Sequence, residues 1–194
     1  MLVLASASPR RQELLRNAGI QFTVQVADVP EIPLADEPPR SFAERMAREK
    51  ALAVSRGRPN DDDVVLGADT IVVVQGQILG KPRDEADAAR MLRLLSGRTH
   101  TVTTGVCLVG QTQGTGTARL LDVRSETSTV TFTALDDGDI QFYISTGEPL
   151  DKAGAYAIQG IASRWITRIE GDYCNVVGLP VALVWRMLRE QKVV

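Results

Sequence analysis

The chain has 194 residues, of which 44% are hydrophobic and 24% are charged, and its formal net charge is −2. These values are typical of a globular protein with a sizeable core, and they argue against a general nucleic-acid binder, which would normally be basic. No run approaches the roughly 20 apolar residues that span a bilayer, and Met1 is followed by a predicted core strand rather than by a basic segment and a signal-type apolar run, so secretion is not expected. We therefore expect a cytoplasmic protein that has no membrane partner and no nucleic-acid partner.

Two cysteines and one histidine restrict the chemistry further. Cys107 and Cys174 are too few for a disulfide scaffold, and we interpret them as reduced, packed thiols. The single histidine excludes a multi-histidine metal centre, and we interpret His100 as structural. Ser6 and Ser8 have no base beside them in a nucleophile pattern, so a covalent serine mechanism is not expected.

The chain begins with a predicted strand, a tight turn and a helix. Leu2–Ala5 is a short apolar run that fits a buried strand. Ser8 can cap the following helix, with Pro9 as its first residue. Arg10 and Arg11 then lie at a helix end that the macrodipole already makes positive. Either a bound anion such as phosphate occupies this end, or the two arginines are solvated on a surface turn.

Strands and helices continue to alternate after this helix. A strand is predicted at Phe22–Val26, followed by a loop rich in proline and acidic residues. Ser41 and Glu44 fit a capping box for a helix that runs to about Gly57. Val64–Val74 is a β-branched run that the tetrapeptide GADT interrupts.

The second half of the chain follows the same pattern. We expect a hairpin turn at Gln75–Gly76 before a strand at Gln77–Leu79, and then a helix that Asp84 caps and Gly97 ends. Further strands are predicted at Thr99–Val109, Glu126–Phe132 and Trp165–Glu170, and a helix at Asp136–Ser145. An amphipathic helix is predicted at Pro180–Gln191, with Trp185 and Leu188 in its core stripe. The glycine-rich residues 110–117 predict a hairpin turn without chemistry. The predicted class is α/β with a mixed sheet, in a single domain over residues 1–194.

Polar side chains next to apolar strands are the main functional signal, and they fall into four clusters. These are Ser6, Ser8, Arg10 and Arg11; Glu31 with Glu49–Lys50; Asp69 and Thr70; and Asp151, Lys152, Tyr156 and Gln159. Lys81 adds a further cation just after the predicted hairpin.

The carboxylate of Asp69 is costly to bury unless it is paired, hydrogen-bonded or bound to a metal. It either braces a neighbouring turn or belongs to a site. Glu31 carries less weight alone, because acidic loop residues are usually solvated. Taken together, carboxylates without a cysteine or histidine set favour Mg²⁺ or Mn²⁺ over Zn²⁺. With several separated cations, they suit a polyphosphate that carries a divalent metal.

Several sequence blocks together resemble one known family. They are, in order, SASPRRQELL, AREKA, GADTIVV, LGKPRD, MLRLLSGRTHTV, EPLDKAGAYAIQG and NVVGLP. From Leu4 to about Leu188 the chain resembles the Maf family of nucleoside triphosphate pyrophosphatases. The resemblance implies an α/β fold related to the inosine triphosphatase-like enzymes, with an elongated mixed sheet flanked by helices and a cleft between two lobes. It also implies metal-dependent hydrolysis of a nucleoside triphosphate to the monophosphate and pyrophosphate, and it allows a homodimer.

The AGAYxIQG form resembles the branch of this family that acts on dTTP and UTP. A second branch, associated with 7-methyl-GTP, carries Glu at the position of Gln159. Arg10, Thr70 and Gln159 match the specificity positions of the dTTP/UTP branch, and Asp69 matches its proposed catalytic acid/base. The match is physically reasonable, since a Gln amide can accept from N3–H and donate to O4 of uracil or thymine.

The resemblance thus implies a role for each cluster. Asp69, Lys50 and Lys81 are expected to be catalytic; Glu31 and Asp69 to hold Mg²⁺ or Mn²⁺, with Co²⁺ as a further option; and Ser6, Ser8, Arg10, Arg11, Thr70, Asp151, Lys152, Tyr156 and Gln159 to bind the substrate. Three alternatives stay open. They are a non-catalytic nucleotide-sensing regulator of septum formation, a family member with another base preference such as 7-methyl-GTP, and a phosphatase that releases orthophosphate.

Overall fold

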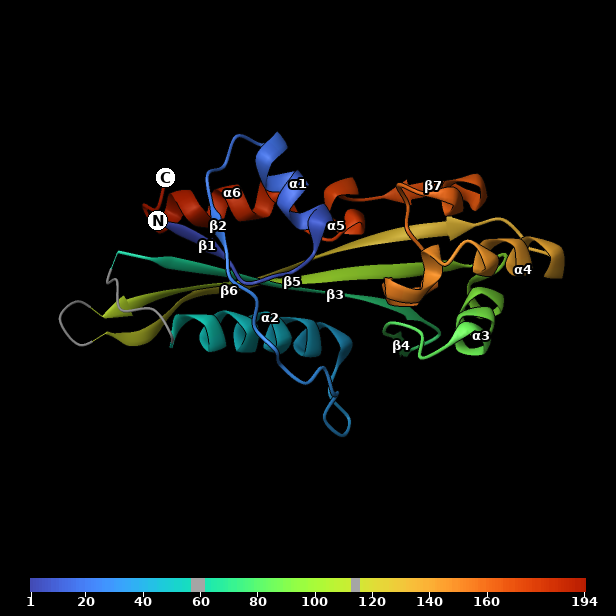
Figure 1. Cartoon of the computed structure of the whole chain (residues 1–194), viewed down its shortest axis with the longest axis horizontal. Helices are drawn as coiled ribbons and strands as arrows, with labels where there is room; N and C mark the ends of the chain where they lie inside the picture. Colours follow the sequence, from blue (N-terminus) through green and yellow to red (C-terminus); the bar gives the residue numbers. More distant parts are fainter. Residues whose placement is uncertain (57–61, 113–115) are drawn as a thin grey trace. The chain divides into compact units, whose positions relative to one another are not determined.

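A computed structural model describes residues 1–56, 62–112 and 116–194. Its strands form one seven-stranded mixed sheet in the order β2-β1-β3-β5-β6-β7, with β4 paired to β3 (Figure 1). The pairs β1–β2 and β1–β3 are parallel, whereas β3–β4 and β6–β7 are antiparallel. The predicted α/β class with a mixed sheet is confirmed. No helix of the described ranges is both long and apolar enough to cross a membrane.

The elements have the following bounds. The strands are β1 (Leu2–Leu4), β2 (Thr23–Val24), β3 (Val64–Val74), β4 (Gln77–Leu79), β5 (Thr99–Thr112), β6 (Thr117–Phe132) and β7 (Ile166–Glu170). The α-helices are α1 (Pro9–Asn17), α2 (Pro39–Ser55), α3 (Glu85–Leu95), α4 (Asp137–Ser145), α5 (Tyr173–Val177) and α6 (Val181–Glu190). Three short 3-10 turns follow α4, at Glu148–Asp151, Ala153–Ala155 and Ile161–Trp165.

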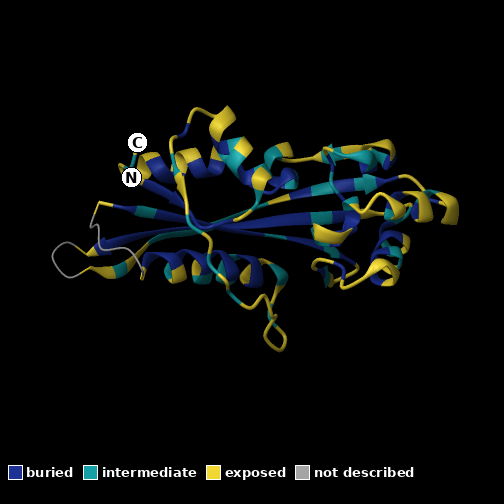
Figure 2. Cartoon of the chain, in the orientation of Figure 1, coloured by how far each residue is buried: buried dark blue, intermediate teal, exposed yellow. Residues whose placement is uncertain are grey.

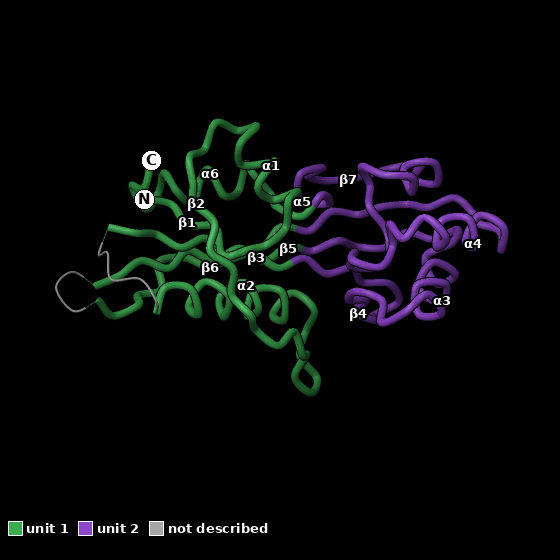
Figure 3. The backbone as a smooth tube through the Cα atoms, in the orientation of Figure 1, with its two compact units in different colours: residues 1–69, 104–126, 178–194 green, residues 70–103, 127–177 purple. Residues whose placement is uncertain are grey.

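The chain divides into two compact units, each built from several segments (Figure 3). Unit 1 contains Met1–Asp69, Thr104–Glu126 and Gly178–Val194, and unit 2 contains Thr70–Thr103 and Thr127–Val177. Strands β3, β5 and β6 contribute residues to both units. That residues 1–194 form a single domain stays a prediction.

In unit 1 the alternation of strand side chains determines which helix each residue contacts. Even-numbered positions of β1 such as Leu2 and Leu4 pack in one cluster with residues of α1 and α6. Odd-numbered positions such as Val3 pack in another cluster with Ala47 and Ala51 of α2. Figure 1 shows α2 on the face of the sheet opposite to α1 and α6, and Figure 2 shows the strands between them as buried. Both faces are covered, which is why these strands read as continuous apolar runs.

Two glycines allow α2 to approach the sheet of unit 1 closely. A Cβ on Gly67 of β3 would lie 2.1 Å from the carbonyl oxygen of Ala47, and a Cβ on Gly105 of β5 would lie 2.3 Å from that of Ala43. Real side chains do not make such contacts. The backbone of α2 therefore rests directly on the strands at these two points.

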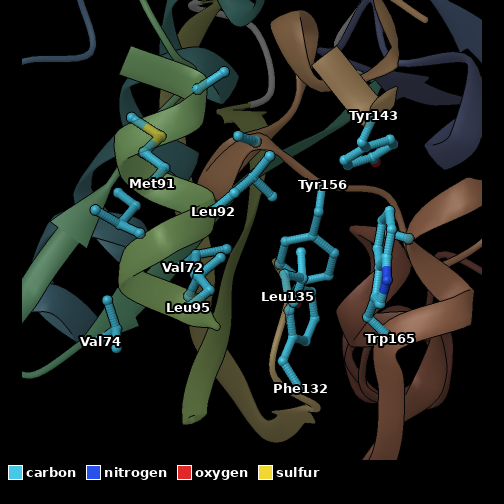
Figure 4. Packing of buried hydrophobic residues seen from close by; sticks show 14 of the residues in the cluster. Val72, Val74, Met91, Leu92, Leu95, Phe132, Leu135, Tyr143, Tyr156 and Trp165 are labelled. Carbon is cyan, nitrogen blue, oxygen red and sulfur yellow. The ribbon is translucent and has the colours of Figure 1, made fainter. Parts of the chain in front are cut away.

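Unit 2 has its own apolar core, formed where α3 and the 3-10 segments pack on the strands (Figure 4). Met91 and Leu92 of α3 pack toward Val72, and Tyr156 lies beside Phe132 in the same cluster. Tyr143 and Trp165 form an edge-to-face pair with centroids 5.4 Å apart. Four buried aromatic side chains thus belong to this unit, namely Phe132, Tyr143, Tyr156 and Trp165.

Several predicted elements are confirmed within a few residues. The Gln75–Gly76 turn joins β3 to β4 with both residues at positive φ, as a two-residue hairpin requires. Asp84 caps α3, because its side chain accepts from the backbone N–H of Asp87. The helices predicted at Asp136–Ser145 and Pro180–Gln191 and the strand predicted at Trp165–Glu170 are likewise present.

Other expectations about local structure are wrong. The GADT tetrapeptide does not interrupt the strand, since β3 runs unbroken from Val64 to Val74. Ser41 and Glu44 do not form a capping box, because α2 begins two residues before Ser41, with Pro38 at the cap position. Pro39 is a favourable first helical residue, because the N–H that proline lacks would have no partner within the helix at that position. Ser8 stands at the cap position of α1, but its side chain makes no capping bond.

Three further differences concern exposure and length. Trp185 is 44% exposed and is not part of the core stripe of α6, whereas Leu188 is fully buried as predicted. Strand β6 begins at Thr117, well before the predicted strand at Glu126, because exposed polar positions weaken its alternation. The predicted helix end at Gly57 and the centre of the predicted turn at residues 110–117 lie outside the described residues.

Candidate active site

Two carboxylates from distant parts of unit 1 meet on one lysine. The Nζ atom of Lys50 donates to Oε1 of Glu31 and to Oδ1 of Asp69, each at 2.6 Å. Glu31 lies in the loop between β2 and α2, Lys50 on α2 and Asp69 inside β3. Lys50 and Asp69 are buried, while Glu31 is exposed. The structure therefore brings together three of the residues that we predicted to be catalytic or metal-binding.

The period of the strand explains why Asp69 reaches α2. Val65, Gly67 and Asp69 alternate along β3 and share one side of it, and Val65 packs in the cluster that contains Ala47 and Ala51 of α2. Gly67 lets the helix backbone approach, and Lys50 lies between those two alanines in the sequence. The Lys50–Asp69 ion pair follows from this close approach.

Burial controls the acidity of Asp69. Removal from water raises the pKa of the Asp69 carboxyl above its ordinary value, while the positive charges of Lys50 and Arg11 act in the opposite direction. The neighbouring charge of Glu31 raises the pKa further. A carboxylate whose proton affinity is raised in this way suits a general base.

Arg11 is buried, and three of its hydrogen bonds go to protein atoms. Its Nε donates to the carbonyl of Gly178 at 2.8 Å, and one terminal nitrogen donates to the carbonyl of Ala68 at 2.8 Å and to Oγ of Ser6 at 3.1 Å. Burial lowers the pKa of Arg11, and the charges of Asp69 and Glu31 oppose that shift. These bonds tie Arg11 to the turn before α1 and to the backbone at Ala68 and Gly178, and its contact with a substrate stays a prediction.

Arg10 differs from its neighbour. Its Nε atom is buried and has no hydrogen-bond partner within the described ranges. It belongs to the first turn of α1, where the helix dipole already favours an anion. The backbone N–H of Ser8 donates to Oγ of Ser6 at 3.2 Å, which shapes the turn. The anion site at this turn stays a prediction.

The carboxylate pair also fits a divalent metal. Within the three described ranges, no group of three or more His, Cys, Asp or Glu side chains could hold a metal alone. Mg²⁺ commonly uses only one or two carboxylates and takes its other ligands from water and substrate phosphates. Glu31 and Asp69 meet at the same Lys50 nitrogen and are the two residues that could supply such a donor set.

The other predicted substrate residues lie in unit 2. Lys81 and Gln159 are exposed, Thr70 is half-buried, and Lys152 forms an ion pair with the adjacent Asp151. Their contact with a substrate stays a prediction.

Tyr156 lies in the core of unit 2, and its contact with a substrate stays a prediction. It is buried, and its hydroxyl lies 2.8 Å from Nε2 of His100. Burial raises the pKa of Tyr156 and lowers that of His100 to about 4. The expectation that His100 is structural is consistent with this environment.

Sequence reasoning missed the pair of Glu37 and Arg45, which joins the loop of Glu31 to α2. The only signal was the spacing of Arg45 and Glu49, four residues apart on a predicted helix. Its partner Glu37 lies in a proline-rich loop, where no helical or strand periodicity predicts which residues are neighbours.

Comparison with known proteins assigns the chain to a family. The family model described as "Maf-like protein" matches residues 1–191. The chain belongs to the Maf family. A relative from Koribacter versatilis named "dTTP/UTP pyrophosphatase" is 58% identical to this Maf protein over 97% of the chain and 93% of the relative. Relatives with the same name from Symbiobacterium thermophilum and Geobacter sulfurreducens are 52% and 49% identical, again over 97% of the chain and over 93% and 95% of their own lengths.

Proposed function

We propose that this Maf protein is a hydrolase that converts dTTP and UTP to the nucleoside monophosphate and pyrophosphate with a divalent metal. The observation that carries the proposal is the buried Lys50 nitrogen that holds Glu31 and Asp69 together at 2.6 Å. The cluster combines cationic and anionic groups of the kind that handle a metal–polyphosphate complex. The names of relatives with 49–58% identity support the choice of substrates.

In the proposed reaction, a water oxygen bonds to the α-phosphorus while the bond from that phosphorus to the α–β bridging oxygen breaks. The carboxylate of Asp69 accepts the proton that the water loses, a role that the raised pKa of Asp69 supports. Pyrophosphate leaves with the bridging oxygen. Arg10 lies at the start of α1, its Nε has no hydrogen-bond partner among the described residues, and in this proposal it binds a phosphate oxygen of the substrate.

Glu31 and Asp69 would hold Mg²⁺ or Mn²⁺ when it is bound, and the metal would neutralise negative charge on the phosphates. Lys50 keeps both carboxylates in place, since it pairs with each of them. Its ammonium adds a positive charge beside the place proposed for the phosphate chain. Gln159 is proposed to read N3–H and O4 of the pyrimidine.

The first test is a product analysis with UTP, dTTP, CTP, GTP, 7-methyl-GTP and ITP, each with Mg²⁺ or Mn²⁺. We expect UMP and dTMP with pyrophosphate, and slow reaction of the other nucleotides. Release of orthophosphate would contradict attack at the α-phosphorus and favour a phosphatase. Absence of turnover with every nucleotide and both metals would favour the nucleotide-sensing regulator.

Two variants sharpen the same test. Asp69→Asn keeps the shape of the side chain but removes its basicity, so we expect kcat to fall roughly 100- to 10,000-fold without loss of fold. Gln159→Glu should weaken the preference for UTP, because a carboxylate has no hydrogen to donate to O4. A Gln159→Glu protein with the wild-type ranking of UTP over CTP would contradict the role of Gln159.

A further inference from the structure

We propose that Arg45 is a positioning residue that holds the loop of Glu31 against α2 and so keeps Glu31 at the metal-binding cluster. The inference rests on the proposed function, because it assigns Glu31 a task in that reaction. Among the described residues, the hydrogen bonds of Arg45 go to Glu37, Glu49 and the carbonyl of Ile32, so Arg45 is predicted to act only through the loop.

The loop that carries Glu31 buries little apolar surface that could stabilise its conformation. Residues 30–36 are all exposed, and Ile32 and Leu34 are 67% and 61% exposed despite their apolar side chains. A segment with so little buried area opens at low free-energy cost unless polar contacts restrain it. Glu31 lies within this segment, yet it must meet a buried lysine.

Arg45 supplies the restraint with a bidentate ion pair and a backbone contact. Its Nε and one terminal nitrogen donate to the two carboxylate oxygens of Glu37, each at 2.7 Å. The same terminal nitrogen donates to the carbonyl of Ile32 at 2.9 Å, and the other terminal nitrogen donates to Glu49 at 3.0 Å. The planar guanidinium thus binds the loop at two places, Ile32 and Glu37, and also binds Glu49 of its own helix.

Glu37 completes the arrangement from the loop side. One oxygen of its carboxylate also accepts from the backbone N–H of Leu34 at 3.0 Å. The hydrogen bond from Arg45 lowers the pKa of Glu37 to about 2, so this carboxylate stays charged throughout the neutral range. Its side chain is only 9% exposed, and that of Arg45 is 15% exposed, which separates this pair from ordinary surface ion pairs.

The backbone contact of Arg45 lies only one residue from Glu31 in the sequence. Ile32, whose carbonyl Arg45 holds, directly follows Glu31, whose carboxylate Lys50 holds. Both anchors, Arg45 and Lys50, belong to the single rigid helix α2. Releasing the first anchor lets the backbone of Glu31 move, so the carboxylate loses its fixed place beside Asp69.

The test compares Arg45→Ala with Arg40→Ala in the full-length protein. Arg40 lies on the same helix and forms an exposed pair with Glu44, so its removal deletes an equal charge without touching the loop. Mn²⁺ binding is measured by electron paramagnetic resonance, and kcat and KM by pyrophosphate release. We expect Arg45→Ala to weaken Mn²⁺ affinity and lower kcat about 10- to 100-fold, the usual effect of losing a group that orients a metal ligand. Arg40→Ala should stay within about twofold of wild type for both quantities.

A double-mutant cycle separates positioning from general stabilisation. In a Glu31→Gln background, Arg45→Ala should add less than about twofold to the loss of Mn²⁺ affinity, because its effect passes through Glu31. Full additivity in the two backgrounds would overturn the inference, as would an Arg45→Ala protein that behaves like Arg40→Ala. Wild-type protein that binds no Mn²⁺ would also overturn it.

Two further measurements keep the result interpretable. Arg45→Lys retains the charge but not the fork, so it provides an intermediate variant if Arg45→Ala does not fold. Amide hydrogen exchange of residues 31–37 should be faster in both Arg45 variants than in Arg40→Ala. If wild-type protein binds Mn²⁺ but releases no pyrophosphate, the proposed function fails, and the cycle on Mn²⁺ affinity still decides the role of Arg45.

Discussion

Asp69 shows which properties of a residue can be predicted from the sequence and which require the structure. A carboxylate in an apolar run is costly, and this cost alone predicts that Asp69 has a partner. The structure identifies the partner as Lys50, at 2.6 Å, and places Asp69 inside a continuous strand rather than in a break. Neither fact was accessible from local sequence, because Lys50 reaches Asp69 only through the packing of α2 on β3.

Tyr156 is the residue for which structure and sequence reasoning suggest different roles. Its hydroxyl pairs with the buried His100, so Tyr156→Phe leaves Nε2 of His100 without that partner. We expect the free energy of unfolding to fall by roughly 1–3 kcal/mol, the cost of an unsatisfied buried polar group. KM for UTP should change less than about threefold. Denaturant unfolding and steady-state kinetics provide the two numbers, and a large rise in KM with unchanged stability would restore Tyr156 to the substrate site.

The pair of His100 and Tyr156 also predicts how the free energy of unfolding depends on pH. Burial lowers the pKa of His100 to about 4, whereas an exposed histidine titrates near 6.5. The unfolded chain therefore binds the proton first as the pH falls, and the contribution of His100 to stability is fully present above about pH 6.5 and lost toward pH 4. Denaturant unfolding at several pH values should show this slope in wild type and a smaller slope in His100→Gln.

At the scale of elements, the contact between α2 and β3 positions the candidate site. Gly67 is required there, since a Cβ would lie 2.1 Å from the carbonyl oxygen of Ala47 and 2.9 Å from the backbone nitrogen of Ala51. Both are helix backbone atoms, so the helix as a whole must move. Periodicity predicted the helix and the strand, but not this contact.

Gly67→Ala should therefore affect both stability and activity. We expect a loss of about 1–3 kcal/mol in the free energy of unfolding, the usual cost of an overpacked core. The outward shift of α2 separates Lys50 from Asp69, so kcat should fall as well. Gly80→Ala is the matched control for stability, because a Cβ at Gly80 meets no atom within 4 Å. Equal stabilities of the two variants in denaturant unfolding would contradict the assigned contact.

At the scale of the whole molecule, metal binding and folding should be separable. Lys50 pairs with both Glu31 and Asp69, and the positive charge of the buried Arg11 also acts on Asp69, so two protein cations offset the two carboxylates in the absence of a metal. Chelation with EDTA should then abolish pyrophosphate release from UTP and leave the Tm within a few degrees of its value in Mg²⁺. Turnover that survives EDTA and dialysis would contradict metal dependence, and a large fall in Tm would contradict the neutralising role of these two cations.

Sequence alone determined the α/β class, most elements and the residue types of the candidate site, because strand alternation, helix caps and turn residues act over short distances. The spacing of Gln75–Gly76 and the cap at Asp84 are examples. Only the tertiary structure decided that Arg11 braces a turn, that Tyr156 faces His100, and that Arg45 holds the loop of Glu31. These contacts join residues that lie far apart in the chain or in loops without periodicity. Their partners are selected by packing, which no local pattern encodes.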